Sequence, residues 1–249
     1  PRRRGRLWRF FRFVFRTLLF LILSGGALIA WVFYQDLTGE LPALERLTHF
    51  TPPSVTRVYA GDRTTLLGEF YLEKRYPLPL SKIPLLVQHA VLASEDKDFY
   101  HHPGVNFSAV TRAFITNWQA GRTVQGGSTI TQQIVKSVLL TPERSYRRKA
   151  QEMILALRLE RQMTKEQIFE IYLNQIYLGS GAYGVEAAAR EYFNKGVADL
   201  TLPEAAMIAG LAPAPSAYDP FKNLQGAKER QRYVLERMME ERFISYAQA

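Results

Sequence analysis

The chain has 249 residues, of which 47% are hydrophobic, and it contains no cysteine. This composition is that of a folded protein that can bury a sizeable core in one large domain or two small ones. The formal net charge is +9, but seven arginines precede the first acid, Asp36, which leaves 25 of the 32 basic residues to balance 23 acids. The positive charge therefore belongs to one end of the chain, which argues against a nucleic-acid partner and for a membrane.

The first predicted element is a membrane anchor. Residues 17–35 form an uncharged, mostly apolar run, and a helix that spans about 30 Å of hydrocarbon needs roughly 20 residues. Trp31 and Tyr34 suit the aromatic belt of a bilayer. The basic segment 1–16 before the run and the acids after it predict a cytoplasmic N-terminus and an exported body. A cleaved signal peptide is the alternative, but the run is long and lacks a suitable cleavage site.

Residues 36–82 are predicted to form a linker and a short β-hairpin. Two stretches rich in strand-forming residues, Val55–Tyr59 and Leu66–Tyr71, flank the turn at Gly61-Asp62. Residues 83–249 are expected to form one domain in which helical periodicity dominates. The fold class is therefore mainly α.

The sequence predicts where several helices begin. A first helix is predicted to run into Glu95, and capping boxes begin at Thr129, Thr164 and Thr201. A charged helix over residues 225–245 is expected to end the chain.

Three polar segments carry the chemistry. Residues 95–104 begin with Glu95 and Asp96, residues 126–133 are rich in Gly, Ser, Thr and Gln, and residues 148–152 combine two cations with Glu152. Two carboxylates, neutral donors and a cluster of cations would suit the transfer of a sugar from a phosphate leaving group. One carboxylate can take a proton from the attacking hydroxyl while cations hold the phosphate.

These three segments lie in the first three of five motifs that occur in order between residues 85 and 218. The motifs are Glu95-Asp-x-x-Phe99-x-x-His102-x-Gly104, Gly127-Ser-Thr-x-Thr-Gln-Gln133, Arg148-Lys-x-x-Glu152, Lys165-x-x-Ile168-x-x-x-Tyr172-Leu-Asn174 and Leu202-Pro-Glu204-Ala-Ala-x-x-Ala-Gly210. In order and spacing they resemble the peptidoglycan glycosyltransferases. With its anchor and hairpin, the chain is similar to the front half of a class A (bifunctional) penicillin-binding protein. The resemblance implies a lysozyme-like glycosyltransferase head with a smaller membrane-proximal jaw, and a C-terminal helix that leads toward a transpeptidase domain.

The resemblance also implies a reaction and a location. A growing glycan chain on polyprenyl pyrophosphate is passed to the 4-hydroxyl of lipid II, with inversion, to give β-1,4 glycan strands. The expected partners are lipid II, the lipid-linked glycan chain, the membrane and cell-wall synthesis proteins. The protein would be single-pass in the cytoplasmic (inner) membrane, with its catalytic domain in the periplasm. A divalent cation, Mg²⁺ or Mn²⁺, is expected, and no organic cofactor.

Roles for single residues follow from the same resemblance. Glu95 occupies the position of the general base, and the apolar helix before it is expected to raise its pKa. Glu152 is the second expected catalytic residue, which orients Arg148 and Lys149 at the pyrophosphate, binds the metal, or protonates the phosphate, the first two roles being favoured. Asp96 and Glu152 are the expected metal ligands. The expected substrate-binding residues are Asp96, Phe99, His102, Ser128, Thr129, Gln132, Gln133, Lys136, Arg148 and Lys149.

Three other functions are compatible with parts of the sequence. A lysozyme-like lytic glycosidase would also use two carboxylates, but cleavage of a neutral glycosidic bond does not need the cations. The sequence Ser94-x-x-Lys97 matches the S-x-x-K of serine acyltransferases, whose partner motifs S-x-N and K-T-G are absent from the sequence. A membrane-anchored structural module is the non-enzymatic alternative.

One apolar stripe lies close to the first motif. Its residues are Phe107, Val110, Phe114, Ile115 and Trp118. Such stripes most often pack in a core. Here part of it is expected to dip into the bilayer, so that a lipid-borne substrate need not leave the membrane.

Overall fold

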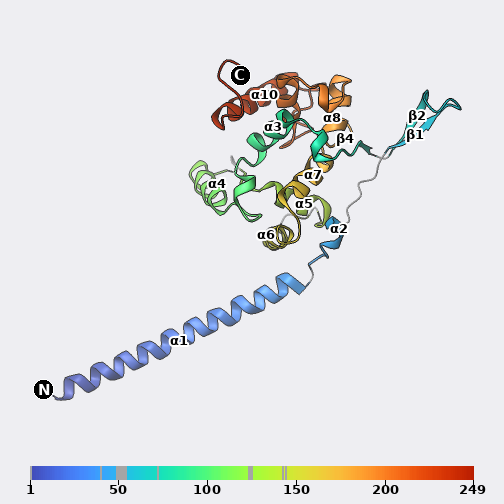
Figure 1. Cartoon of the computed structure of the whole chain (residues 1–249). Helices are drawn as coiled ribbons and strands as arrows, with labels where there is room; N and C mark the ends of the chain where they lie inside the picture. The colour runs from blue at the N-terminus through green and yellow to red at the C-terminus, as the bar shows by residue number, and fades with distance from the viewer. Residues whose placement is uncertain are drawn as a thin grey trace. The chain divides into compact units, whose positions relative to one another are not determined.

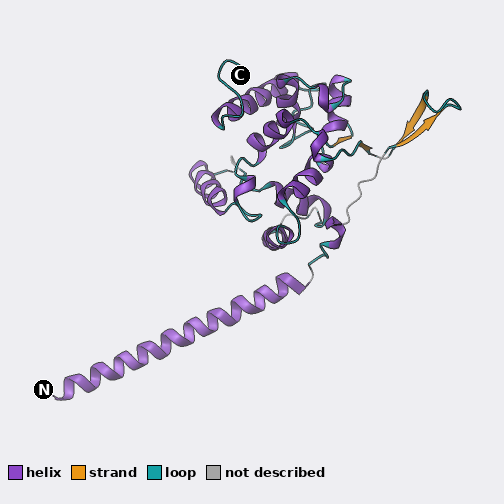
Figure 2. Ribbon diagram, in the orientation of Figure 1, coloured by secondary structure: helices purple, strands orange, loops and turns teal. Residues whose placement is uncertain are grey.

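The computed structural model describes residues 2–39, 41–48, 55–71, 73–122, 126–141, 143 and 145–249. The chain divides into two compact units, Pro1–Pro42 with Arg144–Gln151, and Ala43–Glu143 with Glu152–Ala249. Helices dominate the described residues (Figure 2), which confirms the predicted fold class.

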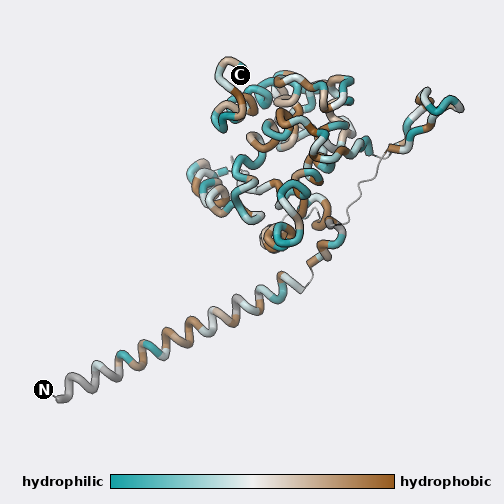
Figure 3. The backbone as a smooth tube through the Cα atoms, viewed as in Figure 1, coloured by the Kyte–Doolittle hydropathy of each residue, from teal (hydrophilic) through white to brown (hydrophobic). Residues whose placement is uncertain are grey.

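The first unit contains one long helix, α1 (Arg2–Gly39). Its window Phe11–Leu28 has a mean hydropathy of 1.6 (Figure 3) and is long and apolar enough to cross a membrane. None of this window is buried. The hydroxyls of Thr17 and Ser24 donate to carbonyls four residues earlier in the helix, at 3.0 and 2.7 Å. These bonds satisfy polar groups that hydrocarbon would otherwise leave unpaired. The predicted anchor over residues 17–35 lies within α1, and its orientation remains a prediction.

The predicted hairpin is present in the second unit. It follows the short helix α2 (Glu45–Thr48) and consists of the antiparallel strands β1 (Thr56–Tyr59) and β2 (Leu66–Phe70). The Asp62 carboxylate stabilises the turn between them by accepting hydrogen bonds from the backbone amides of residues 64 and 65. The end of the preceding linker, at Pro52-Pro53, lies outside the described residues.

The remaining elements lie after the hairpin (Figure 1). They are β3 (Lys74–Arg75), η1 (Leu80–Lys82), α3 (Leu85–Glu95), η2 (Phe99–His101), α4 (Phe107–Ala120), α5 (Ile130–Val138), α6 (Tyr146–Leu159), α7 (Lys165–Gln175), β4 (Ala182–Tyr183), α8 (Val185–Phe193), η3 (Val197–Asp199), α9 (Leu202–Leu211) and α10 (Leu224–Glu240). The two-residue strands β3 and β4 pair in parallel.

Local sequence explains where most of these helices begin. All three predicted capping boxes form, at Thr129, Thr164 and Thr201. The last helix differs from its prediction, because α10 ends at Glu240 and not at residue 245. Arg242 adopts a left-handed conformation with φ 61°, which an α-helix cannot contain.

Small residues bring α3 close to its neighbours. This helix packs against both α9 and α10. Ala90 on α3, and Ala206 and Ala209 on α9, are almost fully buried, and their short side chains allow the helix backbones to approach. The packing fixes the C-terminal end of α3, where Glu95 lies.

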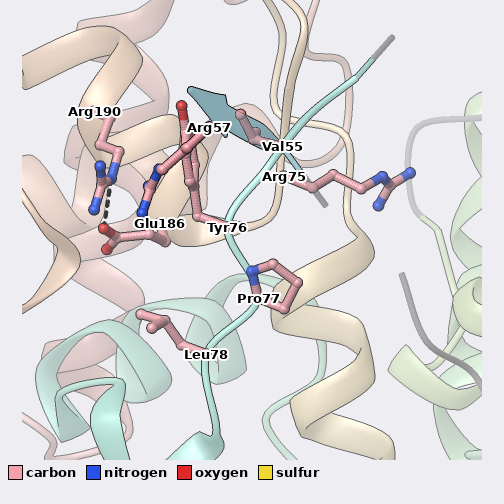
Figure 4. A pocket seen from close by; sticks show the side chains of 8 residues that line it. All are labelled: Val55, Arg57, Arg75, Tyr76, Pro77, Leu78, Glu186 and Arg190. Carbon is pink, nitrogen blue, oxygen red and sulfur yellow. Dashed lines mark hydrogen bonds and ion pairs between the residues drawn. The ribbon is translucent and has the colours of Figure 1, made fainter. Parts of the chain in front are cut away.

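A pocket of about 300 Å³ lies where the base of the hairpin meets α8 (Figure 4). Arg57 of β1 pairs with Glu69 of β2 at 2.9 Å, and the hydroxyl of Tyr76 donates to the same carboxylate at 2.5 Å. The guanidinium groups of Arg57 and Arg190 lie 5.2 and 4.5 Å from the centre of the Tyr76 ring. Arg190 also pairs with Glu186 at 2.7 Å. These contacts join the hairpin to the helical domain.

Candidate functional site

A polar pocket of the second unit has a volume of about 610 Å³. It brings the first two motifs together with Glu152 of the third and with part of α10. Its lining residues are Ala93, Ser94, Glu95, Asp96, Lys97, Asp98, Asn106, Ala109, Arg112, Gly126, Gly127, Ser128, Thr129, Gln133, Lys136, Glu152, Ala212, Pro213, Arg230, Tyr233 and Arg237. The pocket therefore contains both carboxylates that the sequence singled out.

Glu95 ends α3 at the wall of this pocket and remains partly exposed. Burial raises the pKa of its carboxyl, and the hydrogen bond from Gln133 and the positive charge of Arg230 oppose that rise. The Gln133 amide donates to Glu95 Oε2 at 2.8 Å, and the Ser94 hydroxyl lies 3.5 Å from Oε1. The rise in pKa that the sequence predicted is confirmed. A raised pKa makes this carboxylate a stronger base.

Glu152 is almost completely buried, with 1% of its surface exposed. The Gln132 amide donates to its Oε1 at 3.2 Å. Gln132 and Gln133 are adjacent on α5, so the two neighbouring amides hold the two carboxylates of the pocket. The buried Glu152 lies on α6, and the capping box at Thr129 fixes the start of α5.

Asp96 and His102 form the link between the first and second motifs. His102 Nε2 lies 2.9 Å from Asp96 Oδ2, and the backbone amide of Gly104 donates to His102 Nδ1 at 3.2 Å. Because Nδ1 accepts a bond, Nε2 carries the proton and donates to the aspartate. The backbone amide of Ile130, the first residue of α5, donates to the same Oδ2 at 3.0 Å. Asp96 therefore attaches the end of α3 to the start of α5.

These contacts bear on the predicted metal ion. Among the described residues, no three or more His, Cys, Asp or Glu side chains are grouped so that they could hold a metal. Asp96 already accepts hydrogen bonds from His102 and Ile130. The donor set at Asp96 and Glu152 does not fit a preformed divalent-cation site.

Phe99 and Thr129 complete the link between the motifs. Phe99 is fully buried and packs against Phe169 of α7, with ring centres 5.6 Å apart. The Thr129 hydroxyl donates to the Gly104 carbonyl at 2.6 Å. At Gly104 φ is 103°, and an added Cβ would lie 2.6 Å from the carbonyl oxygen of Ala156. Phe99 and Gly104 thus shape the pocket from behind its surface, and Thr129 also lines it.

The predicted cations lie in different units of the structure. Lys136 is exposed and lines the pocket, and within the described part of the chain no ion pair is found for it. Ser128 also lines the pocket. Arg148 and Lys149 lie on α6 in the first unit, and their role remains a prediction from the sequence.

Sequence reasoning missed the cations that α10 contributes. Arg230, Tyr233 and Arg237 line the pocket, and they are spaced three and four residues apart on one face of the helix. The guanidinium of Arg230 lies 4.4 Å from the centre of the Tyr233 ring. The sequence contains this spacing, but a charged helix that only faces solvent has the same spacing, so the pattern alone does not indicate a site. Arg112 of α4 also lines the pocket without having been predicted.

Two carboxylates and several cations around one polar pocket suit the transfer of a sugar from a phosphate leaving group. A sequence model of the family described as Transglycosylase matches residues 63–239. The chain belongs to this transglycosylase family.

Its relatives include much longer proteins. The chain is 48% identical to penicillin-binding protein 1A of Aquifex aeolicus over 214 residues, which are 86% of this chain and 29% of that protein. It is 43% identical to penicillin-binding protein 1A of Rickettsia typhi over 236 residues, 94% of this chain and 30% of that protein. The crystal structure of penicillin-binding protein 1A from Haemophilus influenzae matches 80% of this chain and 20% of its own, at 28% identity and a TM-score of 0.45. The chain thus spans less than a third of these relatives.

Proposed function

We propose that the chain is a peptidoglycan glycosyltransferase that polymerises lipid II into β-1,4 glycan strands. One observation carries this proposal: Glu95, whose pKa burial raises, shares a pocket with the buried Glu152 and with the exposed Lys136. A base and a cation in one pocket suit the attack of a sugar hydroxyl on a carbon that carries a phosphate leaving group.

In this mechanism the Glu95 carboxylate accepts the proton of the 4-hydroxyl of lipid II. The hydroxyl oxygen forms a bond to the anomeric carbon of the growing chain as the bond to the pyrophosphate oxygen breaks. Attack from the side opposite the leaving group inverts the anomeric centre. The Gln133 amide, 2.8 Å from Glu95, holds the base in place for the transfer.

The departing pyrophosphate needs positive charge. Lys136 supplies it in the pocket, because its ammonium is exposed and not committed to an ion pair among the described residues. Arg148 and Lys149 are proposed to add to it, as the motif they belong to predicts. Arg230 and Arg237 give the same pocket further cations, which suit a second phosphate-bearing substrate. Glu152 is proposed to orient Arg148 and Lys149, which share its helix.

The substrate is proposed to reach the site from a membrane. Four large apolar side chains of α4 are between 50% and 76% exposed, namely Phe107, Phe114, Ile115 and Trp118. Exposed apolar area of this kind marks a surface that contacts a partner or a membrane. With α1 as anchor, the proposal places the N-terminus in the cytoplasm and the pocket outside the inner membrane.

A comparison of two substrates tests the reaction. The purified chain in detergent or liposomes is given lipid II in one experiment and finished glycan polymer in another. Growth of polymer from lipid II supports the transferase. Shortening of the polymer without growth from lipid II would instead identify a lytic glycosidase, and a lack of both would leave only a structural role.

A further inference from the structure

Tyr172 lies behind Gln133, on the side away from Glu95. It belongs to α7 and is 3% exposed. Its hydroxyl donates to Gln133 Oε1 at 3.3 Å, while Gln133 Nε2 donates to Glu95 Oε2 at 2.8 Å. Three helices, α7, α5 and α3, thus contribute one residue each to a continuous hydrogen-bonded chain.

We propose that Tyr172 is a positioning residue, whose hydroxyl fixes the side-chain amide of Gln133 in the orientation that donates a hydrogen bond to Glu95. The inference rests on the proposed role of Glu95 as the base. Tyr172 is not among the described residues that line the pocket. It therefore acts through Gln133 and touches no substrate.

The direction of the chain follows from chemistry. A side-chain amide has a donor end and an acceptor end, and a carboxylate is acceptor-only. With Nε2 toward Glu95, the Oε1 atom faces Tyr172 and needs a donor. Burial and the charge of Glu95 raise the pKa of the Tyr172 hydroxyl well above its ordinary value, so the hydroxyl keeps its proton and remains that donor.

Loss of the hydroxyl releases the amide. Without the Tyr172 donor, Gln133 Oε1 is left unsatisfied in a partly buried place, a state that polar groups avoid by rotating. Rotation takes Nε2 away from Glu95 or turns Oε1 toward it, and either change leaves the base less well held. A residue that only filled space would not have this effect, because phenylalanine preserves the shape of the ring.

Polymerisation kinetics test the inference with three variants. Tyr172→Phe is expected to lower kcat about tenfold with little change in KM, the effect of one hydrogen bond to a charged group. Gln133→Met, which removes the amide, should lower kcat at least as much. The double variant should be no slower than Gln133→Met alone, since Tyr172 acts only through Gln133. Additive losses in the double variant would overturn the inference.

Tyr192→Phe is the matched control. Its hydroxyl donates to the Leu178 carbonyl at 2.9 Å. This variant therefore also deletes a hydrogen-bonded tyrosine hydroxyl from the same domain. It should keep the kcat of the parent chain. An equal loss of kcat in Tyr192→Phe and Tyr172→Phe would show a general packing effect and refute the positioning role.

A second readout does not depend on turnover. In infrared difference spectra, the carboxylate stretching band of Glu95 is identified as the band that Glu95→Gln removes. The band should shift in the same direction in Tyr172→Phe and in Gln133→Met, and should stay in place in Tyr192→Phe. An unshifted band in Tyr172→Phe would overturn the inference even if the chain polymerises lipid II. A shifted band would support it even if the proposed reaction failed.

Discussion

The replacement of Asp96 by asparagine separates a structural role of this residue from a metal-binding one. The aspartate accepts hydrogen bonds from His102 at 2.9 Å and from the first amide of α5, that of Ile130, at 3.0 Å. Asparagine with its oxygen in the place of Oδ2 still accepts both of these bonds, but its NH₂ group replaces Oδ1, which lies 3.1 Å from His102 Nε2, and there faces the N–H of His102. One charge-assisted bond is lost, which costs about 1.5–3 kcal/mol. The loss of a negative charge at a helix N-terminus adds about 0.3–1 kcal/mol.

We therefore expect Asp96→Asn to lower the free energy of unfolding by about 3 kcal/mol, which for a domain of this size lowers Tm by roughly 6–12 °C. Thermal unfolding in detergent, followed by circular dichroism, measures the change. Asp98→Asn is the control, because Asp98 is partly exposed and accepts its hydrogen bond from the neutral amide of Asn106. It should lose no more than about 1 kcal/mol.

The outcome with metal decides between the two roles. A structural Asp96 predicts the same loss of Tm with added Mg²⁺ and with a chelator. Equal Tm values for Asp96→Asn and the parent chain, or a difference that only Mg²⁺ produces, would refute the structural reasoning and return Asp96 to the predicted metal site.

Three further predictions concern other parts of the chain. Gly104→Ala should destabilise the fold by several kcal/mol, since φ is 103° and the added Cβ would overlap a backbone carbonyl. Gly121→Ala is the control, because φ is 62° and no atom lies within 4 Å of the added Cβ, and it should cost only about 1 kcal/mol. Equal losses of Tm in the two variants would contradict this prediction. Because the pKa of Glu95 is raised in the folded state, ionisation of this residue lowers the stability of the fold as pH increases. Glu95→Gln should therefore have a higher Tm than the parent chain at pH 7.5 but an equal Tm near pH 4. A difference in Tm that does not change with pH would count against the raised pKa of Glu95. Spin labels at Phe114 and Trp118 on α4 should report burial in the hydrocarbon of liposomes, and labels that stay in bulk water would exclude membrane contact by this helix.

Local signals in the sequence were sufficient for the helix starts and for one property of the site. The capping boxes depend on residues three positions apart, and all three form. The raised pKa of Glu95 followed from the apolar residues just before it in the same helix. In both cases the decisive contacts lie within a few residues of the signal.

Contacts between distant segments could not be predicted in the same way. Nothing near Arg230 or Arg237 indicates that α10 packs against α3 and brings both arginines to the pocket. The hydrogen bond that Asp96 accepts from the amide of Ile130 joins residues 34 positions apart, so the link between this carboxylate and a helix start could not be predicted from the neighbouring sequence. The two-residue parallel pairing of β3 with β4 likewise requires the tertiary fold.

The central claim is that Glu95 removes the proton from the attacking sugar hydroxyl. Synthesis of glycan strands from labelled lipid II by Glu95→Gln, beside the parent chain and with folding of both verified by circular dichroism, tests it most directly. We expect the folded variant to lose polymerisation by a factor of at least about 10². Strand synthesis at the parental rate by a folded Glu95→Gln chain would contradict the mechanism.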